Sequence, residues 1–281
     1  MPMINILITL NHDYIAPLKV MMQSLCENNK NCHFRIFVVH SSLTSADFEK
    51  INAGIPSERC EIVDIFVPYD RFPDLPYSQQ WPKEACYRIF AAHILPGDLE
   101  RVLYLDPDIV VINNIEQLYT VDMEDNYFAA CTHLFEPVQS VVRSRLKMAQ
   151  GSVYVNSGMM LINLKQLREE QNIGEVYEYI KKNRKKLHLF DQDTLNGLYS
   201  EKIMPLNPLL YNLDEKYFNT YRMKPNSKPN RIDREWVQKN TVIIHFCGKR
   251  KPWKETYRGV FGGYYNEYAE KCRLAEAGKQ L

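Results

Sequence analysis

Short apolar runs alternate with amphipathic segments along the first half of the chain. The runs are rich in Ile and Val and cover residues 4–10, 34–39 and 62–67, and helical patterns at 14–27 and 45–52 separate them. This order predicts a β-α-β-α-β arrangement. Because the runs are apolar on both faces, they are typical of parallel strands covered by helices on both sides. We therefore expect an α/β fold with a doubly wound sheet.

The second half has a more mixed pattern. An amphipathic helix is predicted at 83–95, and the strand that follows it, 102–105, ends at Asp106. Asp191 is predicted to be the N-cap of a later helix. The segment 205–229 is rich in Pro, Asn and Tyr, which predicts long ordered loops. The other predicted elements are strands at 127–131, 158–162 and 241–246 and helices at 164–169, 173–183 and 264–277.

The charge is balanced overall but unevenly distributed. The 281 residues carry 35 basic and 34 acidic side chains, a formal +1, which argues against nucleic acid as the main partner. Residues 1–140 hold 9 basic and 19 acidic side chains, whereas 141–281 hold 26 and 15. Such an asymmetry suits a site that holds both a cation and an anionic ligand, although solvated charge on separate faces is the commoner cause.

Cysteine usage and the N-terminus indicate where the protein works. The seven Cys include no C-x-x-C pair, which favours reduced thiols and a cytoplasmic location over a disulfide framework or a zinc site. The N-terminal run MPMINILITL has no preceding basic region, and no segment approaches the roughly 20 apolar residues of a membrane span. We expect a protein that is neither exported nor embedded in a membrane.

The segment RVLYLDPDIVV places two carboxylates directly after a predicted strand. Asp106 and Asp108 stand two residues apart, so in extended backbone they point the same way, and Pro107 ends the strand pairing. Ligands of open α/β sheets bind beyond the carboxyl ends of the strands. Two like charges in one site favour a divalent cation with oxygen ligands. The alternative is a turn with solvated acids, and D-x-D alone does not decide between the two.

A second polar segment, TVIIHFCGKRKPW, follows the last predicted strand. His245 beside two carboxylates favours Mn²⁺ over Mg²⁺ or Ca²⁺, because nitrogen ligands suit the later metal. Gly248 allows close backbone approach, and the lysines, Lys251 among them, would meet phosphate. A core histidine and a solvated basic turn are the structural alternatives.

Two further segments bring short polar side chains to the ends of predicted elements. Asn156 and Ser157 precede the predicted strand in VYVNSGMMLINL, where Asn can bond sugar or ribose hydroxyls. Asp191 and Gln192 begin the predicted helix in LFDQDTLNGLY. An ordinary loop corner explains the first pair, and helix capping explains one acid of the second, but capping does not readily explain three successive polar residues.

Together, LDPD, NSGMMLINL, DQDTLNGL and HFCGKRKPW resemble, in this order and spacing, bacterial glycosyltransferase family 8. This family comprises retaining galactosyl- and glucosyltransferases, including lipooligosaccharide α-galactosyltransferases and glycogenin. The resemblance implies a GT-A fold with a mixed central sheet, here as a single domain over 1–281 with the terminal helix packed on it. It also implies a divalent metal, Mn²⁺ or Mg²⁺, and a UDP-sugar donor. UDP-glucose or UDP-galactose would supply a hexose to a saccharide or glycolipid acceptor.

The resemblance assigns roles to individual residues. Gln192 matches the side chain under the anomeric carbon and Asp191 the acid that holds the sugar hydroxyls. Because Gln is a poor nucleophile, we expect front-face attack, with the leaving phosphate oxygen taking the acceptor proton. The other matches are Asp106, Asp108 and His245 to the metal ligands, Gly248 and Lys251 to diphosphate contacts, and Arg88, Asn156 and Ser157 to donor contacts.

The chain departs from the galactosyltransferase branch at two places. That branch has an acid facing uracil after the first strand, where this chain has Asn11; an amide can still pair with the imide edge of uracil. The branch also carries a basic, aromatic tail for membrane attachment, whereas this chain stops soon after its last predicted helix. We therefore expect at most peripheral membrane contact.

Three rival functions stand against this interpretation of the sequence pattern: a nucleotidyltransferase, a nucleotide-sugar-binding protein and a primer protein. A nucleotidyltransferase that makes the UDP-sugar would need a Gly-rich loop after the first strand, and LITLNHDY contains no glycine. A nucleotide-sugar-binding protein without transferase activity and a self-glucosylating primer protein are the remaining alternatives. The acceptor is not indicated, and the segment 73–81 is a candidate lid or a fixed surface turn.

Overall fold

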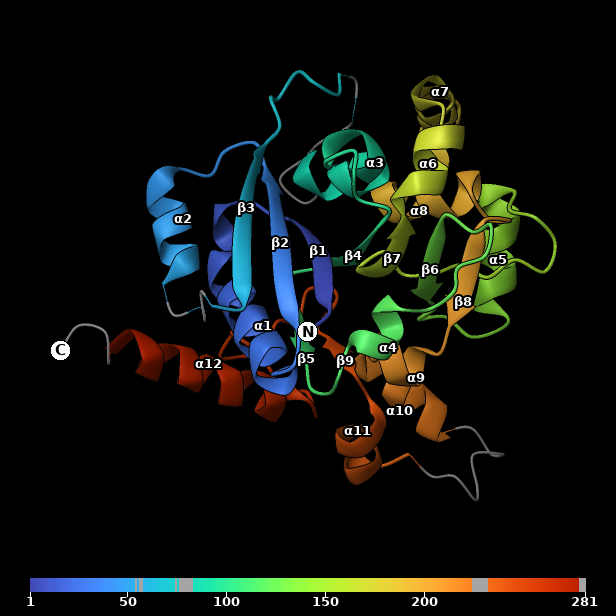
Figure 1. Ribbon diagram of the computed structural model, residues 1–281. Coiled ribbons are helices and arrows are strands. Elements are labelled where there is room, and N and C mark those ends of the chain that lie inside the picture. The colour runs from blue at the N-terminus through green and yellow to red at the C-terminus, as the bar shows by residue number, and fades with distance from the viewer. Residues whose placement is uncertain (54, 56–57, 74, 76–82, 224–231, 278–281) are drawn as a thin grey trace.

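The computed structural model describes residues 1–281 except 54, 56–57, 74, 76–82, 224–231 and 278–281. Its centre is a seven-stranded sheet with the strand order β3-β2-β1-β4-β7-β6-β8 (Figure 1). The strands are β1 (Met3–Thr9), β2 (His33–His40), β3 (Cys60–Phe66), β4 (Arg101–Leu105), β6 (Phe128–Cys131), β7 (Met159–Asn163) and β8 (Ile203–Leu206). The sequence predicted all of these except β8, each within a few residues.

The sheet is parallel in one half and mixed in the other. β1 pairs in parallel with β2 and β4, and β2 pairs in parallel with β3. β7 runs antiparallel to β4, β6 runs antiparallel to β7, and β8 lies parallel to β6. The doubly wound parallel pattern therefore stops at β4. Pairing of Leu105 with Met159 then brings the residues after β4 beside those before β7.

Alternate side chains of β1 enter two cores. Ile4, Ile6 and Ile8 pack with α1 (Ile15–Asn28) and α2 (Ser45–Asn52) on one face. Leu7 packs in the core of the other face. The elements that cover this second face are η2 (Lys83–Phe90), α3 (Ala91–Ile94), α6 (Leu164–Glu170), α7 (Ile173–Asn183) and α8 (Phe190–Leu198). The runs in β1 and β2 are thus largely buried on both sides, as their composition predicted, whereas the run in the edge strand β3 is only partly buried and Phe66 is exposed.

A second, two-stranded sheet lies below the first in Figure 1 and consists of β5 (Ile109–Val111) and β9 (Ile243–His245) in antiparallel pairing. A third core joins it to α9 (Pro208–Tyr211), α10 (Glu215–Met223), α11 (Arg234–Asn240) and α12 (Gly262–Ala277). The terminal helix α12 packs along α1 (Figure 1).

The prediction of long loops over 205–229 is wrong for the part that the structure describes. This segment holds the end of β8, then α9 and α10, while 224–231 lie outside the described residues. Burial of Tyr217 and Phe218 in the third core stabilises α10, and local composition does not reveal such tertiary packing.

Several short helices were not predicted or differ in type. The predicted helix at 83–95 is 3₁₀ over Lys83–Phe90 before it becomes α3. The structure adds η1 (His12–Tyr14), α4 (Glu116–Tyr119), α5 (Val138–Leu146) and η3 (Arg184–Lys186). All four are shorter than ten residues, too short for a helical period to be decisive.

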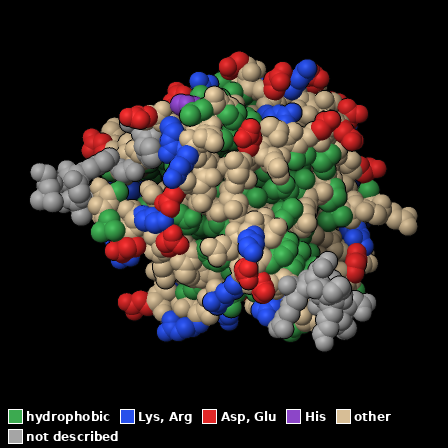
Figure 2. Space-filling model, turned by 60° about the horizontal axis from the view of Figure 1, so that its bottom comes forward, with side chains coloured by type: hydrophobic (Ala, Val, Ile, Leu, Met, Phe, Trp, Pro, Cys, Tyr) green, Lys and Arg blue, Asp and Glu red, His purple; other side chains and the backbone are tan. Residues whose placement is uncertain are grey.

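The surface in Figure 2 carries acidic and basic side chains mixed together, so the charge asymmetry between the two halves of the sequence does not separate on this face. The seven cysteines are free. Among the described residues, no helix combines the length and the apolar character that crossing a membrane requires.

Candidate active site

The two predicted carboxylates and the predicted histidine converge at the carboxyl end of β4. His245 Nε2 lies 3.2 Å from Asp108 Oδ1 and 3.7 Å from Asp106 Oδ2. Pairing of β5 with β9 sets Ile109 opposite His245, and the Phe246 amide donates to the Asp108 carbonyl at 3.0 Å. The interval Asp106–Asp108 therefore spans the gap between the two sheets, with both side chains turned to one histidine.

The three ligand atoms fit a divalent cation. They lie within 4.8 Å of one another. His245 Nδ1 donates to the side-chain oxygen of Asn212 at 2.9 Å, so the lone pair of Nε2 faces the carboxylates, the arrangement in which a metal-binding histidine is held by an outer partner. Gly158 leaves the space that these side chains occupy. A Cβ atom at this position would lie 2.6 Å from Asp106 Oδ2 and 2.2 Å from the His245 ring, which is too close for any other residue without a shift of the neighbours.

Asp106 is the most open of these groups. Its side chain is 22% exposed, against 7% for Asp108 and 2% for His245. Burial on its own would raise the pKa of Asp108, but a protonated His245 together with Lys251 outweighs burial and holds the pKa well below its usual range. Asp108 is thus held as an anion, and Asp106 is the carboxylate that solvent reaches.

The basic turn after β9 divides into one inward and two outward side chains. Lys251 is largely buried, forms an ion pair with Asp108 and donates to the Phe246 carbonyl at 3.0 Å. Lys249 and Arg250 are exposed. Gly248 has a φ of +81°, a left-handed conformation that favours glycine, and this turn brings Lys251 back toward Asp108.

Arg88 links the metal-binding corner to a second polar group. Its guanidinium lies 3.1 Å from Asp106 Oδ1 and 3.3 Å from Asp191 Oδ2, and it donates to the Ser157 carbonyl at 2.8 Å. The guanidinium also lies over the Tyr104 ring, 4.3 Å from its centroid. One buried guanidinium therefore positions the carboxylate that follows β4 and a carboxylate of α8.

The predicted residues of the NSG and DQD segments contact each other directly. Gln192 accepts at Oε1 from the Asn156 amide at 3.0 Å and from the Ser157 backbone N–H at 3.2 Å. Ser157 Oγ donates to Asp191 Oδ2 at 3.0 Å. Burial raises the pKa of Asp191, and Arg88 opposes that rise. These four side chains, predicted separately, form one network.

Asp191 is not a helix cap, so that prediction is wrong. The helix α8 already begins at Phe190, and the N-cap residue is Leu189. The nearby backbone amides of His188 and Leu189 bond instead to the carboxylate of Asp193, at 2.6 and 3.1 Å. Asp193 also pairs with Arg145 at 2.9 Å and turns away from Asp191. The side chain of Leu189 makes no capping hydrogen bond, and the Asp191 carboxylate is bound by Arg88 and Ser157 instead.

Asn11 lies after β1 and accepts from the Asp13 backbone N–H at 3.2 Å, as the N-cap of η1. It shares the sheet edge of Asp106 through neighbouring strands, since the Tyr104 hydroxyl bridges Thr9 at 3.2 Å and Asp106 at 2.6 Å. The segment 73–81, the candidate lid, lies almost wholly outside the described residues.

Sequence reasoning missed two residues of the site. Tyr104 stands two positions before Asp106, so the same alternation that paired Asp106 with Asp108 could have found it. Asn212 is fully buried, holds His245 and donates to Asn156 Oδ1 at 3.0 Å. Its carbonyl accepts from His133 at 2.8 Å, and burial lowers the pKa of that histidine. No signal marked Asn212 within its Pro- and Asn-rich segment.

Known proteins resemble this chain in sequence and in fold. The family model described as Glycosyl transferase family 8 matches residues 5–257. A lipopolysaccharide 1,2-glucosyltransferase of Escherichia coli is 27% identical over 91% of this chain and 75% of its own length. A lipopolysaccharide 1,3-galactosyltransferase of Salmonella typhimurium strain LT2 is 27% identical over 82% of this chain and 66% of its own.

Among solved structures, galactosyltransferase LgtC in complex with donor and acceptor sugar analogues superposes with a TM-score of 0.82. The match covers 95% of each chain at 24% identity, and it confirms the GT-A fold. Since the family model spans most of the sequence, this chain belongs to glycosyl transferase family 8 and is a glycosyltransferase.

Proposed function

We propose that this glycosyltransferase moves a hexose, glucose or galactose, from a UDP-sugar to an acceptor hydroxyl of a glycan or glycolipid, with retention of configuration. The observation that carries the proposal is the convergence of Asp106, Asp108 and His245 on one point, with Arg88 joining them to Asp191. A cation-binding corner beside a network of hydrogen-bonding side chains suits a substrate that has a diphosphate at one end and a sugar at the other.

Asp106, Asp108 and His245 would hold a divalent cation, Mn²⁺ or Mg²⁺. When bound, this cation supplies Lewis-acid stabilisation of the diphosphate that leaves the sugar. Lys251 brings a further positive charge to the same corner and donates a charge-assisted hydrogen bond to the departing phosphates. Gly248 offers its backbone N–H to the diphosphate, because no side chain there obstructs a close approach.

The sugar would lie against the network of Arg88, Asn156, Ser157, Asp191 and Gln192. Asp191 accepts from the sugar hydroxyls, and Arg88 and Ser157 hold its carboxylate in place. Gln192 turns its amide dipole toward the anomeric carbon, where positive charge develops. We assign front-face attack, in which the leaving phosphate oxygen takes the acceptor proton as the C–O bond to UDP breaks.

Uracil would be read by Asn11 at the end of β1. A side-chain amide accepts from the imide N–H and donates to an imide carbonyl, so it can replace an acid at this position. The free state of all seven cysteines favours a reducing compartment, and we propose the cytoplasm.

A donor screen tests the proposal. The purified chain is incubated with UDP-glucose, UDP-galactose and GDP-sugars in Mn²⁺, and the released nucleotide is measured. We expect one of the two UDP-hexoses to give the highest rate. The control is Glu61→Gln, which alters an exposed ion pair with Arg35 at the edge of the sheet. This variant should release nucleotide at the wild-type rate. Preference for a GDP-sugar would refute the donor assignment.

A further inference from the structure

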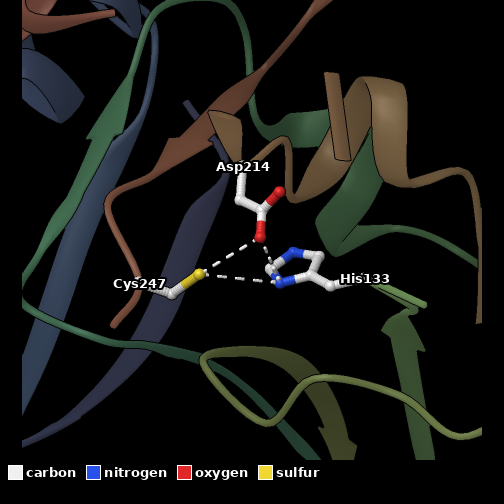
Figure 3. Close-up of side chains that lie close together, drawn as sticks. All are labelled: His133, Asp214 and Cys247. Carbon is white, nitrogen blue, oxygen red and sulfur yellow. Dashed lines mark hydrogen bonds and ion pairs between the residues drawn. The ribbon is translucent and has the colours of Figure 1, made fainter. Parts of the chain in front are cut away.

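A second cluster of metal-ligating side chains lies beside the first. His133 follows β6, Asp214 immediately precedes α10, and Cys247 follows β9 (Figure 3). Asp214 Oδ2 lies 3.2 Å from His133 Nδ1 and 3.3 Å from Cys247 Sγ, and the sulfur lies 3.8 Å from Nδ1. Three segments distant in sequence thus turn one nitrogen, one oxygen and one sulfur toward a common point.

These separations match the edges of a tetrahedral zinc-type site. Bonds of about 2.0–2.2 Å to nitrogen and oxygen and about 2.3 Å to sulfur place tetrahedral ligands roughly 3.3 Å apart for N–O and roughly 3.6 Å apart for pairs with sulfur. The observed 3.2, 3.3 and 3.8 Å agree with these values to about 0.3 Å. A small cation would therefore need little movement of the three side chains.

The hydrogen bond at the other ring nitrogen of His133, Nε2, is an independent indication of metal binding. Its Nε2 lies 2.8 Å from the Asn212 carbonyl oxygen, which can only accept, so Nε2 carries the hydrogen. In the neutral ring, Nδ1 then directs a lone pair at the carboxylate of Asp214. Metal-bound histidines typically donate their other N–H to a backbone carbonyl in this way. A cation between Nδ1 and Oδ2 resolves the contact of two electron-rich atoms.

The charge of the cluster also suits a divalent cation. Without a metal, the Cys247 thiol donates to Asp214 Oδ2. On binding, the thiol proton leaves to solvent and the sulfur bonds to the metal as thiolate. One thiolate and one carboxylate then balance the two positive charges, with a neutral imidazole as third ligand. Sulfur and nitrogen ligands select Zn²⁺ or Co²⁺, whereas oxygen ligands suit Mg²⁺ and Mn²⁺.

We propose that His133, Asp214 and Cys247 form a second metal site, for a Zn²⁺-type cation, separate from the site at Asp106 and Asp108. With three protein ligands, a four-coordinate cation would take water or another ligand in its fourth position. Asn212 joins the two sites, because its side chain holds His245 and its backbone carbonyl holds His133. The centroids of the His133 and His245 rings lie 5.9 Å apart. A cation bound to His133 would therefore help to fix the position of His245, which faces the first metal site.

Cobalt titration tests the site. The full chain, stripped of metal with chelator, is titrated with Co²⁺ while the sulfur-to-cobalt charge-transfer absorption is recorded. We expect this band in the wild type and in Asp108→Asn, since it depends on Cys247 and not on the first site. Cys247→Ser should abolish it, and Cys272→Ser, which alters a thiol bonded to the Lys19 carbonyl, should keep it. Absence of the band in the wild type, or its survival in Cys247→Ser, would overturn the proposal.

Protection of the Cys247 thiol from alkylation gives a second readout. It uses the wild-type chain, so it does not require that a variant lacking a metal ligand folds. We expect Zn²⁺ to slow alkylation of Cys247 by iodoacetamide, located by peptide mass mapping, while alkylation of Cys272 stays unchanged. His133→Gln should raise the Co²⁺ concentration at half-saturation at least about tenfold, because loss even of an outer partner typically costs 10- to 100-fold in metal affinity. Equal alkylation of Cys247 with and without saturating Zn²⁺ would reject the site.

Discussion

The two sides of the active site differ in how the negative charge of their carboxylates is compensated. The metal side consists of Asp106, Asp108, His245 and Lys251, and the sugar side of Arg88, Ser157, Asp191 and Gln192. On the metal side, two carboxylates and one imidazole nitrogen converge on a common point, a set that fits a divalent cation although Asp108 also pairs with Lys251 and Asp106 with Arg88. On the sugar side, a buried guanidinium and several neutral donors already satisfy the one carboxylate and the amide oxygen.

This difference indicates how each side contributes to transfer. Preorganised donors act without reorganising during the reaction, whereas a carboxylate pair acts only through the cation that it binds. Substitutions of the metal ligands should therefore change the Mn²⁺ concentration at half-maximal rate. Substitutions on the sugar side should lower turnover and leave that concentration unchanged.

The largest expected effect is that of Asp108→Asn. Loss of a ligand removes metal stabilisation from the transition state, so turnover should fall by about two or more orders of magnitude, measured as released UDP. Folding should persist, because the amide keeps the shape of the carboxyl group, and circular dichroism checks this. A variant with wild-type turnover at low Mn²⁺ would end the distinction between the two sides.

Asp191→Asn tests the sugar side. A hydrogen bond to a charged group contributes about 1.5–3 kcal/mol, so turnover should fall about 10- to 150-fold while the Mn²⁺ concentration at half-maximal rate stays the same. Asp193→Asn is the matched control, since it breaks the ion pair with Arg145 at a fully buried carboxylate. That change should lower the free energy of unfolding by about 3 kcal/mol. Unchanged turnover in Asp191→Asn would remove this residue from the site.

Lys251→Ala separates the inward lysine from its exposed neighbour. Loss of a charge-assisted hydrogen bond should weaken UDP binding by about 1.5–3 kcal/mol, measured by calorimetry in Mn²⁺. Lys249→Ala, at an exposed position of the same turn, should change it by less than about 1 kcal/mol. Equal losses in the two variants would show that only the general charge of the turn matters.

The smallest effect is expected for Gln192→Ala. This change removes one dipole near a developing positive charge, which corresponds to about 0.5–1.5 kcal/mol, or a roughly 2- to 12-fold slower turnover. Mass spectrometry of the enzyme after reaction with donor should find no sugar attached to Gln192 or Asp191. A trapped glycosyl-enzyme at either residue would replace front-face attack with a covalent mechanism.

Local pattern was sufficient to predict most of the sheet and several helices. Residues 45–52 are predicted and observed as the same helix, because a capping box at Thr44 and Asp47 fixes its start within the sequence itself. The prediction failed where tertiary contacts decide. The 3₁₀ geometry at 83–90 and the helix α10 depend on burial against distant segments, which a single sequence does not display.

The site residues were predictable only in part for the same reason. Asp106, Asp108 and His245 come from segments with recognisable order and spacing, and the structure brings them together. The resemblance assigned Asp191 to the sugar, but the local pattern also made this residue a helix cap. Only tertiary contacts show that Asp191 pairs with Arg88 and Asp193 with Arg145. Asn212 was missed because an asparagine in a Pro-rich segment is typical of a turn.

UDP release by the wild-type enzyme, measured with the preferred UDP-hexose before and after chelation, tests the central claim most directly. If Asp106, Asp108 and His245 hold the cation that stabilises the leaving diphosphate, chelator should reduce release to background, and added Mn²⁺ should restore it. Full release of UDP in the presence of chelator would contradict the account.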